Sequence, residues 1–322
     1  MNLTEPQQGK PFAIVESKGA LLQDIPESDF IAWYKKYGAI MFRSFDVDMD
    51  TFQALTNRYC VSSVFNESPD RRLLDETTQV QTVNLGTAPF PLHPELSREP
   101  FKPDVCFFWC IEPPEGGGQT TVCDGVEIVK SMPPQLYNIF ARRRFLYRQL
   151  ASSEVCEYWL GEAMPSDAQL ANTASSSCPY HFFRNPAGKI VREFSRPALH
   201  KPMFCDDLAF GNFLLFARYH LNMKKFPSFD GPELIPDSVV TGVKNISDRL
   251  TAPAGWQPGD VLVLDNTRFM HGRTAIANPD QRLIASYFGY LAFAEPDAEE
   301  PENAIWRREA FTPPHKKMVQ GR

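Results

Sequence analysis

Residues 91 to 97 of the chain read PLHPELS and place a histidine two positions before a glutamate. On an extended strand, residues i and i+2 point to the same face, so His93 and Glu95 would present an imidazole and a carboxylate together. Two imidazoles and one carboxylate on one face of an octahedral metal ion leave three positions open for other ligands. The pattern therefore predicts a metal site that needs one more histidine.

His271 is the candidate for that third ligand. It follows the stretch WQPGDVLVLDNTRFM, which reads as a turn, a strand rich in Val and Leu, and a polar end. A strand that ends in polar residues and delivers a histidine is typical of sites at the mouths of β barrels. The other four histidines are interpreted as structural or exposed residues: His181, His200, His220 and His315.

Arg282 lies eleven residues after His271 and opens the predicted strand RLIASYFGY. Three open positions on Fe(II) suit a chelating 2-oxo acid and O₂, and the far carboxylate of such an acid needs a cationic anchor. An arginine binds a carboxylate with two parallel hydrogen bonds, which favours this role for Arg282. A surface ion pair is the alternative interpretation.

Four stretches of the chain resemble, in the same order, the motifs of the Fe(II)/2-oxoglutarate-dependent oxygenases of the taurine dioxygenase and clavaminate synthase-like group. They are YGAIMFRSFDVDMDTF, LHPE, PPEGGGQTTVCDG, and GDVLVLDNTRFMHGR with the arginine that follows it. A histidine and a glutamate at this spacing occur by chance, whereas four blocks in family order are specific. The resemblance implies a double-stranded β-helix (jelly-roll) core.

The resemblance also implies roles for individual residues. His93, Glu95 and His271 would hold Fe(II). Arg282 would bind the 5-carboxylate of 2-oxoglutarate, and the hydroxyl of Thr120 would donate to the same group, with Thr121 as the alternative. Three further family positions, where hydrogen bonds would hold the ligand histidine in orientation, correspond to Asp265, Asn266 and Arg273.

The implied activity is oxidation of an unactivated C–H bond with O₂, coupled to decarboxylation of 2-oxoglutarate to succinate. Because Glu95 is a carboxylate, we expect hydroxylation, with desaturation or cyclisation as alternatives; relatives that chlorinate have a small residue there. Ser286 stands where taurine dioxygenase-like relatives often carry a second arginine, so taurine is not the expected substrate. We expect a small amino-acid-derived or natural-product intermediate, free or tethered to a carrier protein.

Three polar residues precede His93 on a stretch that faces the substrate in relatives: Gln79, Gln81 and Asn84. Substrate contact is one interpretation of this stretch. Ordinary strand-surface polarity is the other.

The remaining elements predict a mainly β fold with helical additions. Short apolar runs between Gly and Pro indicate strands in VQTVNLG, VCFFWCI, QTTVCDG, GDVLVLDN and RLIASYFGYLAF. A helix with Ser28 as N-cap is predicted from the apolar spacing in SDFIAWYKKYG. Two more helices are predicted in GVEIVKSMPPQLYNIFARRRF and DDLAFGNFLLFARYHLNM. A hairpin is predicted in YHFFRNPAGKIVREFS. We predict a single domain over residues 1–322, with a β core at about 80–125 and 250–295 and a partly helical insertion at about 126–249.

Composition restricts the partners. The net charge of −6 argues against nucleic acid, and no apolar run is long enough to predict a membrane span. Seven dispersed cysteines and an N-terminus without a secretory pattern are typical of a cytoplasmic protein. No feature of the sequence indicates an oligomeric state.

Two other functions fit the same ligands. A non-catalytic jelly-roll protein that binds a metal or small ligand would not turn over 2-oxoglutarate and leaves the spacing from His271 to Arg282 unexplained. A non-redox metalloenzyme would use the three ligands with zinc or manganese but has no need for Arg282 and Thr120.

Overall fold

The computed structural model describes residues 1–75, 77, 79–171, 178–231 and 233–314. Within these residues, nine strands form one large sheet, in the order β1-β2-β3-β15-β8-β17-β6-β5, with β4 also paired to β17. Their bounds are β1 Asn2–Thr4, β2 Ala13–Glu16, β3 Ala39–Arg43, β4 Cys60–Ser63, β5 Leu73–Asp75, β6 Val80–Thr82, β8 Val105–Glu112, β15 Val261–Asp265 and β17 Leu283–Leu291.

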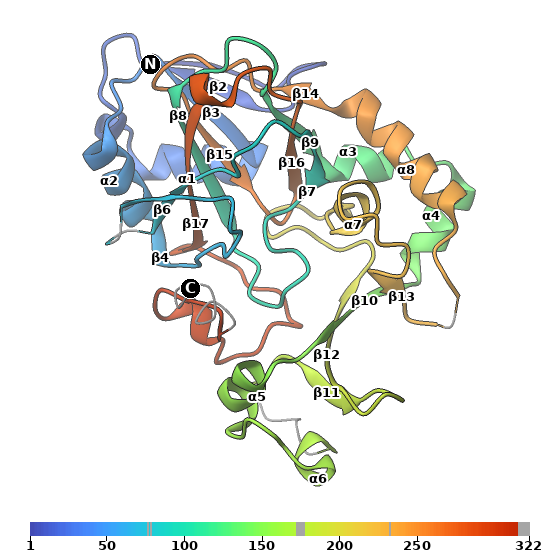
Figure 1. The fold of residues 1–322 in the computed structure, drawn as a ribbon. Helices are drawn as coiled ribbons and strands as arrows, with labels where there is room; N and C mark the ends of the chain where they lie inside the picture. Colours follow the sequence, from blue (N-terminus) through green and yellow to red (C-terminus); the bar gives the residue numbers. More distant parts are fainter. Residues whose placement is uncertain (76, 78, 172–177, 232, 315–322) are drawn as a thin grey trace.

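The large sheet is buried on both faces, which explains why its central strands read as continuous apolar runs. Val105, Phe107 and Trp109 of β8 face helices α1 (Glu27–Tyr37) and α2 (Met49–Tyr59) and pack into one core cluster. The alternate residues, such as Phe108, face the other way into a second cluster. In Figure 1 the two helices lie along the outer side of this sheet.

A smaller sheet lies against that second face. Within the described chain it has the order β14-β9-β16-β7. Its strands are β7 Phe90–His93, β9 Thr120–Asp124, β14 Ala252–Pro253 and β16 Phe269–Arg273. Val122 and Phe269 share the core cluster of Phe108, so apolar side chains join the two sheets in a jelly-roll arrangement. The two sheets do not close into a barrel.

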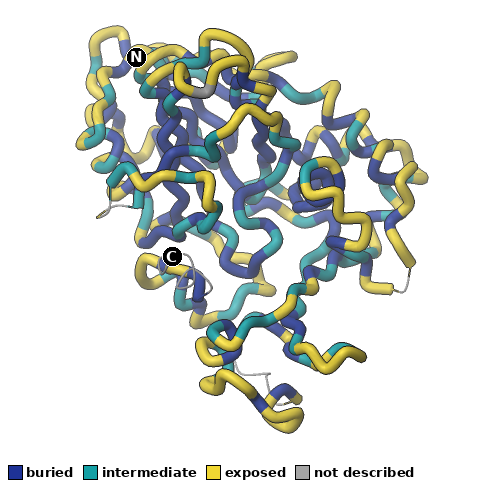
Figure 2. Tube along the Cα trace, viewed as in Figure 1, coloured by how far each residue is buried: buried dark blue, intermediate teal, exposed yellow. Residues whose placement is uncertain are grey.

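Helices cover the outer face of the small sheet. Cys123 and Met270 alternate with the inward residues of their strands and pack among side chains of four helices. These are α3 Gly125–Lys130, α4 Pro134–Ala141, α7 Leu214–Tyr219 and α8 Asp237–Leu250. Figure 2 shows the resulting buried centre, with the exposed residues around the periphery of the molecule.

The lower extension in Figure 1 contains a third sheet, in the order β11-β12-β10-β13 among the residues described. Its strands are β10 Arg144–Leu150, β11 His181–Arg184, β12 Ile190–Pro197 and β13 Ser228–Phe229, accompanied by α5 Ser153–Leu160 and α6 Asp167–Ala171. A buried ion pair ties the extension to the core: Nη2 of Arg192 lies 3.2 Å from Oε1 of Glu99, four residues beyond Glu95.

The mainly β fold with a jelly-roll core is confirmed, and the predicted strands and hairpin are present. The bounds of several elements differ from the prediction. The large sheet extends into the N-terminal segment, because β3 pairs with β15 and carries β2 beside it. Pro26, rather than Ser28, precedes the first turn of α1, whereas Gly38 ends that helix at φ 68° as expected.

Two predicted helices are shorter than expected. Pro133 and Pro134 interrupt the helix predicted after residue 125 and divide it into α3 and α4, since proline lacks the amide hydrogen that a helix interior needs. Of the segment DDLAFGNFLLFARYHLNM, only α7 is α-helical. No helix in the described part of the chain has the length and apolar character needed to cross a membrane. The assignment of the whole chain to one domain stays a prediction.

Candidate metal centre

The three predicted ligands meet between the two sheets. Strand β7 ends at His93 and pairs antiparallel with β16, so that His271 lies opposite His93 with 4.7 Å between the ring centroids. Glu95 lies just beyond β7, in a turn where Leu96 has a φ of 50°. The premise that His93 and Glu95 share one extended strand is therefore wrong, yet ligand atoms of all three residues lie within 4.8 Å of one another.

His93 has the protonation state that a metal needs. Its Nδ1 lies 2.8 Å from the backbone carbonyl of Pro91, so the hydrogen belongs on Nδ1 and the lone pair on Nε2. Burial, with His271 adding repulsion, lowers the pKa of His93 to about 3, although Glu95 opposes the shift. The ring is therefore neutral at physiological pH, which leaves a nitrogen lone pair for a cation.

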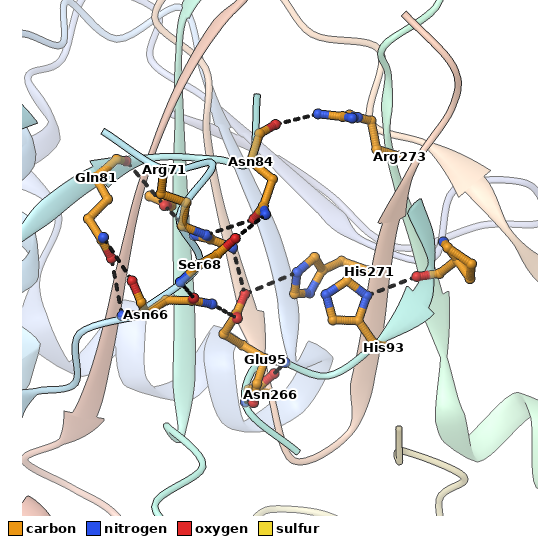
Figure 3. Close-up of polar contacts among 12 residues, drawn as sticks. Asn66, Ser68, Arg71, Gln81, Asn84, His93, Glu95, Asn266, His271 and Arg273 are labelled. Atoms are coloured by element: carbon orange, nitrogen blue, oxygen red, sulfur yellow. Dashed lines mark hydrogen bonds and ion pairs between the residues drawn. The ribbon is translucent and has the colours of Figure 1, made fainter. Parts of the chain in front are cut away.

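Glu95 provides the negative charge of the site. Burial by itself raises the pKa of Glu95, but Arg71, His271 and His93 outweigh it, so that the pKa lies well below its usual range. One of its carboxylate oxygens, Oε2, lies 3.6 Å from Nε2 of His271. The charged carboxylate and two imidazoles form a three-ligand set that suits Fe(II) and leaves positions open for further ligands (Figure 3).

A cavity beside the ligands is lined by both predicted 2-oxoglutarate residues, Thr120 and Arg282. The guanidinium Nε of Arg282 donates to the carbonyl of Gly118 at 2.7 Å, and its Nη2 lies 3.4 Å from Oγ1 of Thr120. Gly118 has a φ of 64°, so the glycine run before Thr120 supplies a backbone shape that other residues rarely adopt. Thr121, the alternative to Thr120, is not among the residues that line the cavity.

Positive charge dominates this cavity. Arg71, Arg273 and Arg282 all line it, whereas Glu95 is the one carboxylate in contact with any of the three among the described residues. Burial lowers the pKa of Arg282 to about 10, and repulsion from Arg273 adds to the shift. A buried cation without a counter-ion is costly, so the arrangement favours an anionic ligand.

Asn266 and Asp265, which were expected to orient a ligand histidine, have other contacts. The side chain of Asn266 binds the backbone of Glu95, since its Oδ1 accepts from the amide at 2.7 Å and its Nδ2 donates to the carbonyl at 3.0 Å. The carboxylate of Asp265 accepts from the amide and hydroxyl of Thr267. Thus the residue that Asn266 holds is the ligand glutamate.

Arg273 also does not contact a ligand histidine. Its guanidinium donates to the backbone carbonyls of Asn84 and, at 2.6 Å, of Ala88. It also covers the ring of Phe90 at 4.7 Å from the centroid. Arg273 therefore fastens the segment before β7 to β16.

The three residues predicted to face the substrate are separated by the fold. Asn84 lines the cavity. Gln79 accepts a hydrogen bond from Ser63, and Gln81 binds the backbone of Asn66, so neither is among the residues lining the cavity. Substrate contact by the two glutamines has no support from this geometry, whereas Asn84 is in position for it.

Sequence reasoning missed Asn66 and Arg71, which both contact the carboxylate of Glu95. They lie in the stretch FNESPDRRLLD, whose proline and small polar residues mark a loop. No local spacing relates this loop to Glu95, because the contacts join residues 29 and 24 positions apart. Only the folded arrangement brings these residues together.

Comparisons with known proteins agree with this geometry. The family model described as "Taurine catabolism dioxygenase TauD, TfdA family" matches residues 11–287. No curated protein matches the chain.

Several solved structures share the fold. PvcB of Pseudomonas aeruginosa is 12% identical, with 92% of this chain and 93% of that chain covered and a TM-score of 0.58. AAD-2, solved with Mn(II) and N-oxalylglycine, is 11% identical, with 92% and 99% covered and a TM-score of 0.57. A structure described as PvcB, an Fe, α-ketoglutarate-dependent oxygenase from an isonitrile synthetic pathway, is 12% identical, with 89% of each chain covered and a TM-score of 0.55.

These relatives support the predicted fold at low sequence identity. The family match covers most of the chain and includes all three candidate metal ligands. The chain belongs to the TauD/TfdA dioxygenase family, and it is an Fe(II)/2-oxoglutarate-dependent dioxygenase.

Proposed function

We propose that the protein hydroxylates an unactivated C–H bond of a small molecule, with His93, Glu95 and His271 as the iron ligands. The observation that carries this proposal is the buried His–Glu–His group, whose ligand atoms lie within 4.8 Å of one another beside the cavity. Bound iron would supply the oxidising chemistry by using O₂ and 2-oxoglutarate, with succinate and CO₂ as co-products. The protein residues bind, orient and shield the reactants.

We assign the far carboxylate of 2-oxoglutarate to Arg282 and Thr120. Arg282 donates from Nε to the carbonyl of Gly118, and its terminal nitrogen Nη2 lies 3.4 Å from Thr120 Oγ1 at the edge of the cavity that both residues line. The hydroxyl of Thr120 accepts from Nε1 of Trp256 at 3.1 Å, so its own hydrogen is free for an anion. A guanidinium fork and a hydroxyl are the donors that a buried carboxylate needs.

Aromatic side chains shield the metal ligands. The ring of Phe108 stands edge-on to His271 at 5.0 Å, and the ring of Phe216 lies 4.6 Å from His93. These apolar faces exclude water from the imidazoles and lower the local dielectric, which strengthens the attraction between the ligands and a cation.

Glu95 decides between reaction types. The carboxylate of Glu95 supplies the third protein ligand beside the two imidazoles. A halide therefore has no free position on the metal where that ligand binds. We therefore assign hydroxylation, with desaturation or cyclisation as the alternatives, to an amino-acid-derived or natural-product intermediate, free or carrier-tethered. Asn84, which lines the same cavity, would contact the substrate. A cytoplasmic location is part of the same proposal.

An anaerobic titration of the metal-free protein tests the assignment. Fe(II) followed by 2-oxoglutarate should produce the weak visible charge-transfer band of a chelated 2-oxo acid. The His271→Ala variant should lose the band, and the control His181→Ala, which alters an exposed histidine of β11, should keep it. A folded wild-type protein without the band would favour a non-catalytic binding protein.

A further inference from the structure

The carboxylate of Glu95 could bind a metal ion in more than one way, but only one of these suits the site. Its side chain has one more rotatable bond than aspartate, and a carboxylate can bind a metal through one oxygen or through both. A three-ligand site that also takes a two-point 2-oxo acid and O₂ needs three open positions, so the carboxylate must bind through one oxygen. The surroundings of Glu95 show how its second oxygen is occupied.

Asn66 covers the oxygen Oε1. Its side-chain Nδ2 donates to Oε1 of Glu95 (Figure 3). The amide cannot turn away, because its Oδ1 accepts from the backbone amide of Ser68 at 2.8 Å. Gln81 holds the backbone of Asn66 on both sides, accepting from its amide at 3.2 Å and donating to its carbonyl at 3.0 Å.

Arg71 fixes the other oxygen, Oε2. Its Nη2 lies 3.2 Å from Oε2, the oxygen that faces Nε2 of His271. An ionised carboxylate oxygen has two lone-pair sites, so one can accept from Arg71 while the other stays available to a cation. Arg71 is itself anchored, since its Nε donates to Oδ1 of Asn84 at 2.8 Å and its Nη1 donates to the hydroxyl of Ser286 at 3.1 Å.

The hydrogen bonds around Glu95 form a closed ring. Asn84, which accepts from Arg71, donates to the hydroxyl of Ser68 at 2.5 Å, and Ser68 orients Asn66. The guanidinium of Arg71 also lies over the ring of Phe288, 5.0 Å from its centroid. Both ends of the loop between β4 and β5 therefore converge on one carboxylate, and that carboxylate is 3% exposed.

We propose that Asn66 and Arg71 are positioning residues that make Glu95 a one-oxygen ligand. Asn66 keeps Oε1 away from the metal, and Arg71 directs Oε2 toward the two histidines. The proposal rests on the assignment of Glu95 as an iron ligand under the proposed function. It assigns the loop at residues 66–71 a role in keeping coordination positions free for 2-oxoglutarate.

The proposal predicts different effects of an Asn66 substitution on metal affinity and on 2-oxoglutarate affinity. Without the Asn66 amide, Oε1 can rotate onto the metal and take a position that 2-oxoglutarate needs. Metal affinity should then stay equal or increase, while 2-oxoglutarate affinity falls at least tenfold. A purely structural role would instead lower both affinities together with the thermal midpoint of the metal-free protein.

Asn66→Ser is the variant of choice. A serine hydroxyl can still accept from the amide of Ser68 and preserve the turn, but it is too short to reach Glu95. Asn66→Ala is the second variant, and Thr77→Ala is the matched control, because Thr77 is an exposed polar residue just after β5 whose hydroxyl donates to Asp75 and does not contact Glu95. Each protein is loaded with Mn(II), and water-proton relaxation then reports the number of exchanging waters on the metal.

In the wild type and Thr77→Ala, relaxation should correspond to about three metal-bound waters. In Asn66→Ser it should correspond to about two, with Mn(II) affinity within threefold of the wild type or tighter. Wild-type relaxation and wild-type 2-oxoglutarate affinity in both Asn66 variants would overturn the proposal, and so would a joint loss of both affinities with the thermal midpoint. A wild-type protein that binds neither Mn(II) nor Fe(II) would overturn the proposed function as well, which separates the two failures.

Discussion

Replacing Arg282 with methionine should change stability and cosubstrate affinity in opposite directions. Arg282 is 8% exposed, and its guanidinium has no carboxylate within ion-pair distance in the described chain. Burial and the charge of Arg273 lower its pKa from the usual 12.5 to about 10. That difference corresponds to about 3 kcal/mol by which the charged form destabilises the ligand-free protein.

The methionine removes this cost but also the hydrogen bond from Nε to the carbonyl of Gly118, which contributes about 1 kcal/mol. The metal-free Arg282→Met protein should therefore be more stable by about 2 kcal/mol. Its affinity for 2-oxoglutarate should fall, because truncating one partner of a buried charge pair costs about 3 kcal/mol, or roughly 150-fold. Fe(II) affinity should change little, since Arg282 does not contact the three metal ligands.

Two measurements check this prediction: the thermal midpoint of the metal-free protein, and 2-oxoglutarate titration followed by the charge-transfer band. Arg268→Met is the matched control, because Arg268 already binds Asp124 with two hydrogen bonds near 3.1 Å and one at 2.5 Å. The control should lose stability and keep its 2-oxoglutarate affinity. If Arg282→Met bound 2-oxoglutarate within threefold of the wild type, the carboxylate assignment would be refuted. A lower thermal midpoint in Arg282→Met would refute the reasoning about the unpaired charge.

Three further predictions follow from buried groups. Burial raises the pKa of Asp265 from 3.8 to about 6, so the protein should lose about 2 kcal/mol of stability as the pH rises from 4 to 6 and this buried carboxyl group ionises. The Asp265→Asn variant should not show this decrease when thermal midpoints are compared across that range. Glu99→Gln leaves Arg192 as a buried, unpaired cation and should lower the free energy of unfolding by about 3 kcal/mol in urea titrations. A Cβ on Gly272 would meet the carbonyl oxygen of Phe90 at 2.5 Å, so Gly272→Ala should push β7 from β16 and weaken Fe(II) binding at least tenfold in direct titrations.

Each of these three predictions would be contradicted by a specific result. A stability difference between wild type and Asp265→Asn that is the same at pH 4 and pH 6 would show that folding does not raise the pKa of Asp265. A loss below about 1 kcal/mol in Glu99→Gln would mean that the remaining hydrogen bonds of Arg192 suffice. Unchanged Fe(II) affinity in Gly272→Ala would show that the two strands can separate without displacing their histidines.

Much of the metal centre could be predicted from the sequence because its parts are encoded locally. His93 and Glu95 are two positions apart, and His271 and Arg282 belong to one β-rich stretch. Strands β8, β15 and β17 were visible as apolar runs, since burial on both faces demands continuous apolar residues. The turn between β11 and β12 was visible because Asn185, Pro186 and Gly188 are residue types that tight turns favour, and Gly188 has a φ of 75°.

Other features depended on contacts that no local pattern encodes. Pro94 ends β7 before Glu95, so the carboxylate reaches the site from a turn and depends on Asn266, 171 positions away, to hold its backbone. Gln81 was expected near the substrate, but the pairing of β6 with β17 directs it toward Asn66.

The sequence by itself determined the chemical groups of the site, because two imidazoles, one carboxylate and an arginine at these spacings have few other uses. Only the tertiary structure decided how the carboxylate is presented. Asn66 and Arg71 reach Glu95 from a loop that precedes it by 29 and 24 positions. Side-chain hydrogen bonds act over about 3 Å, so they depend on where the packing of β17 and β6 brings that loop, and this is a property of the whole fold.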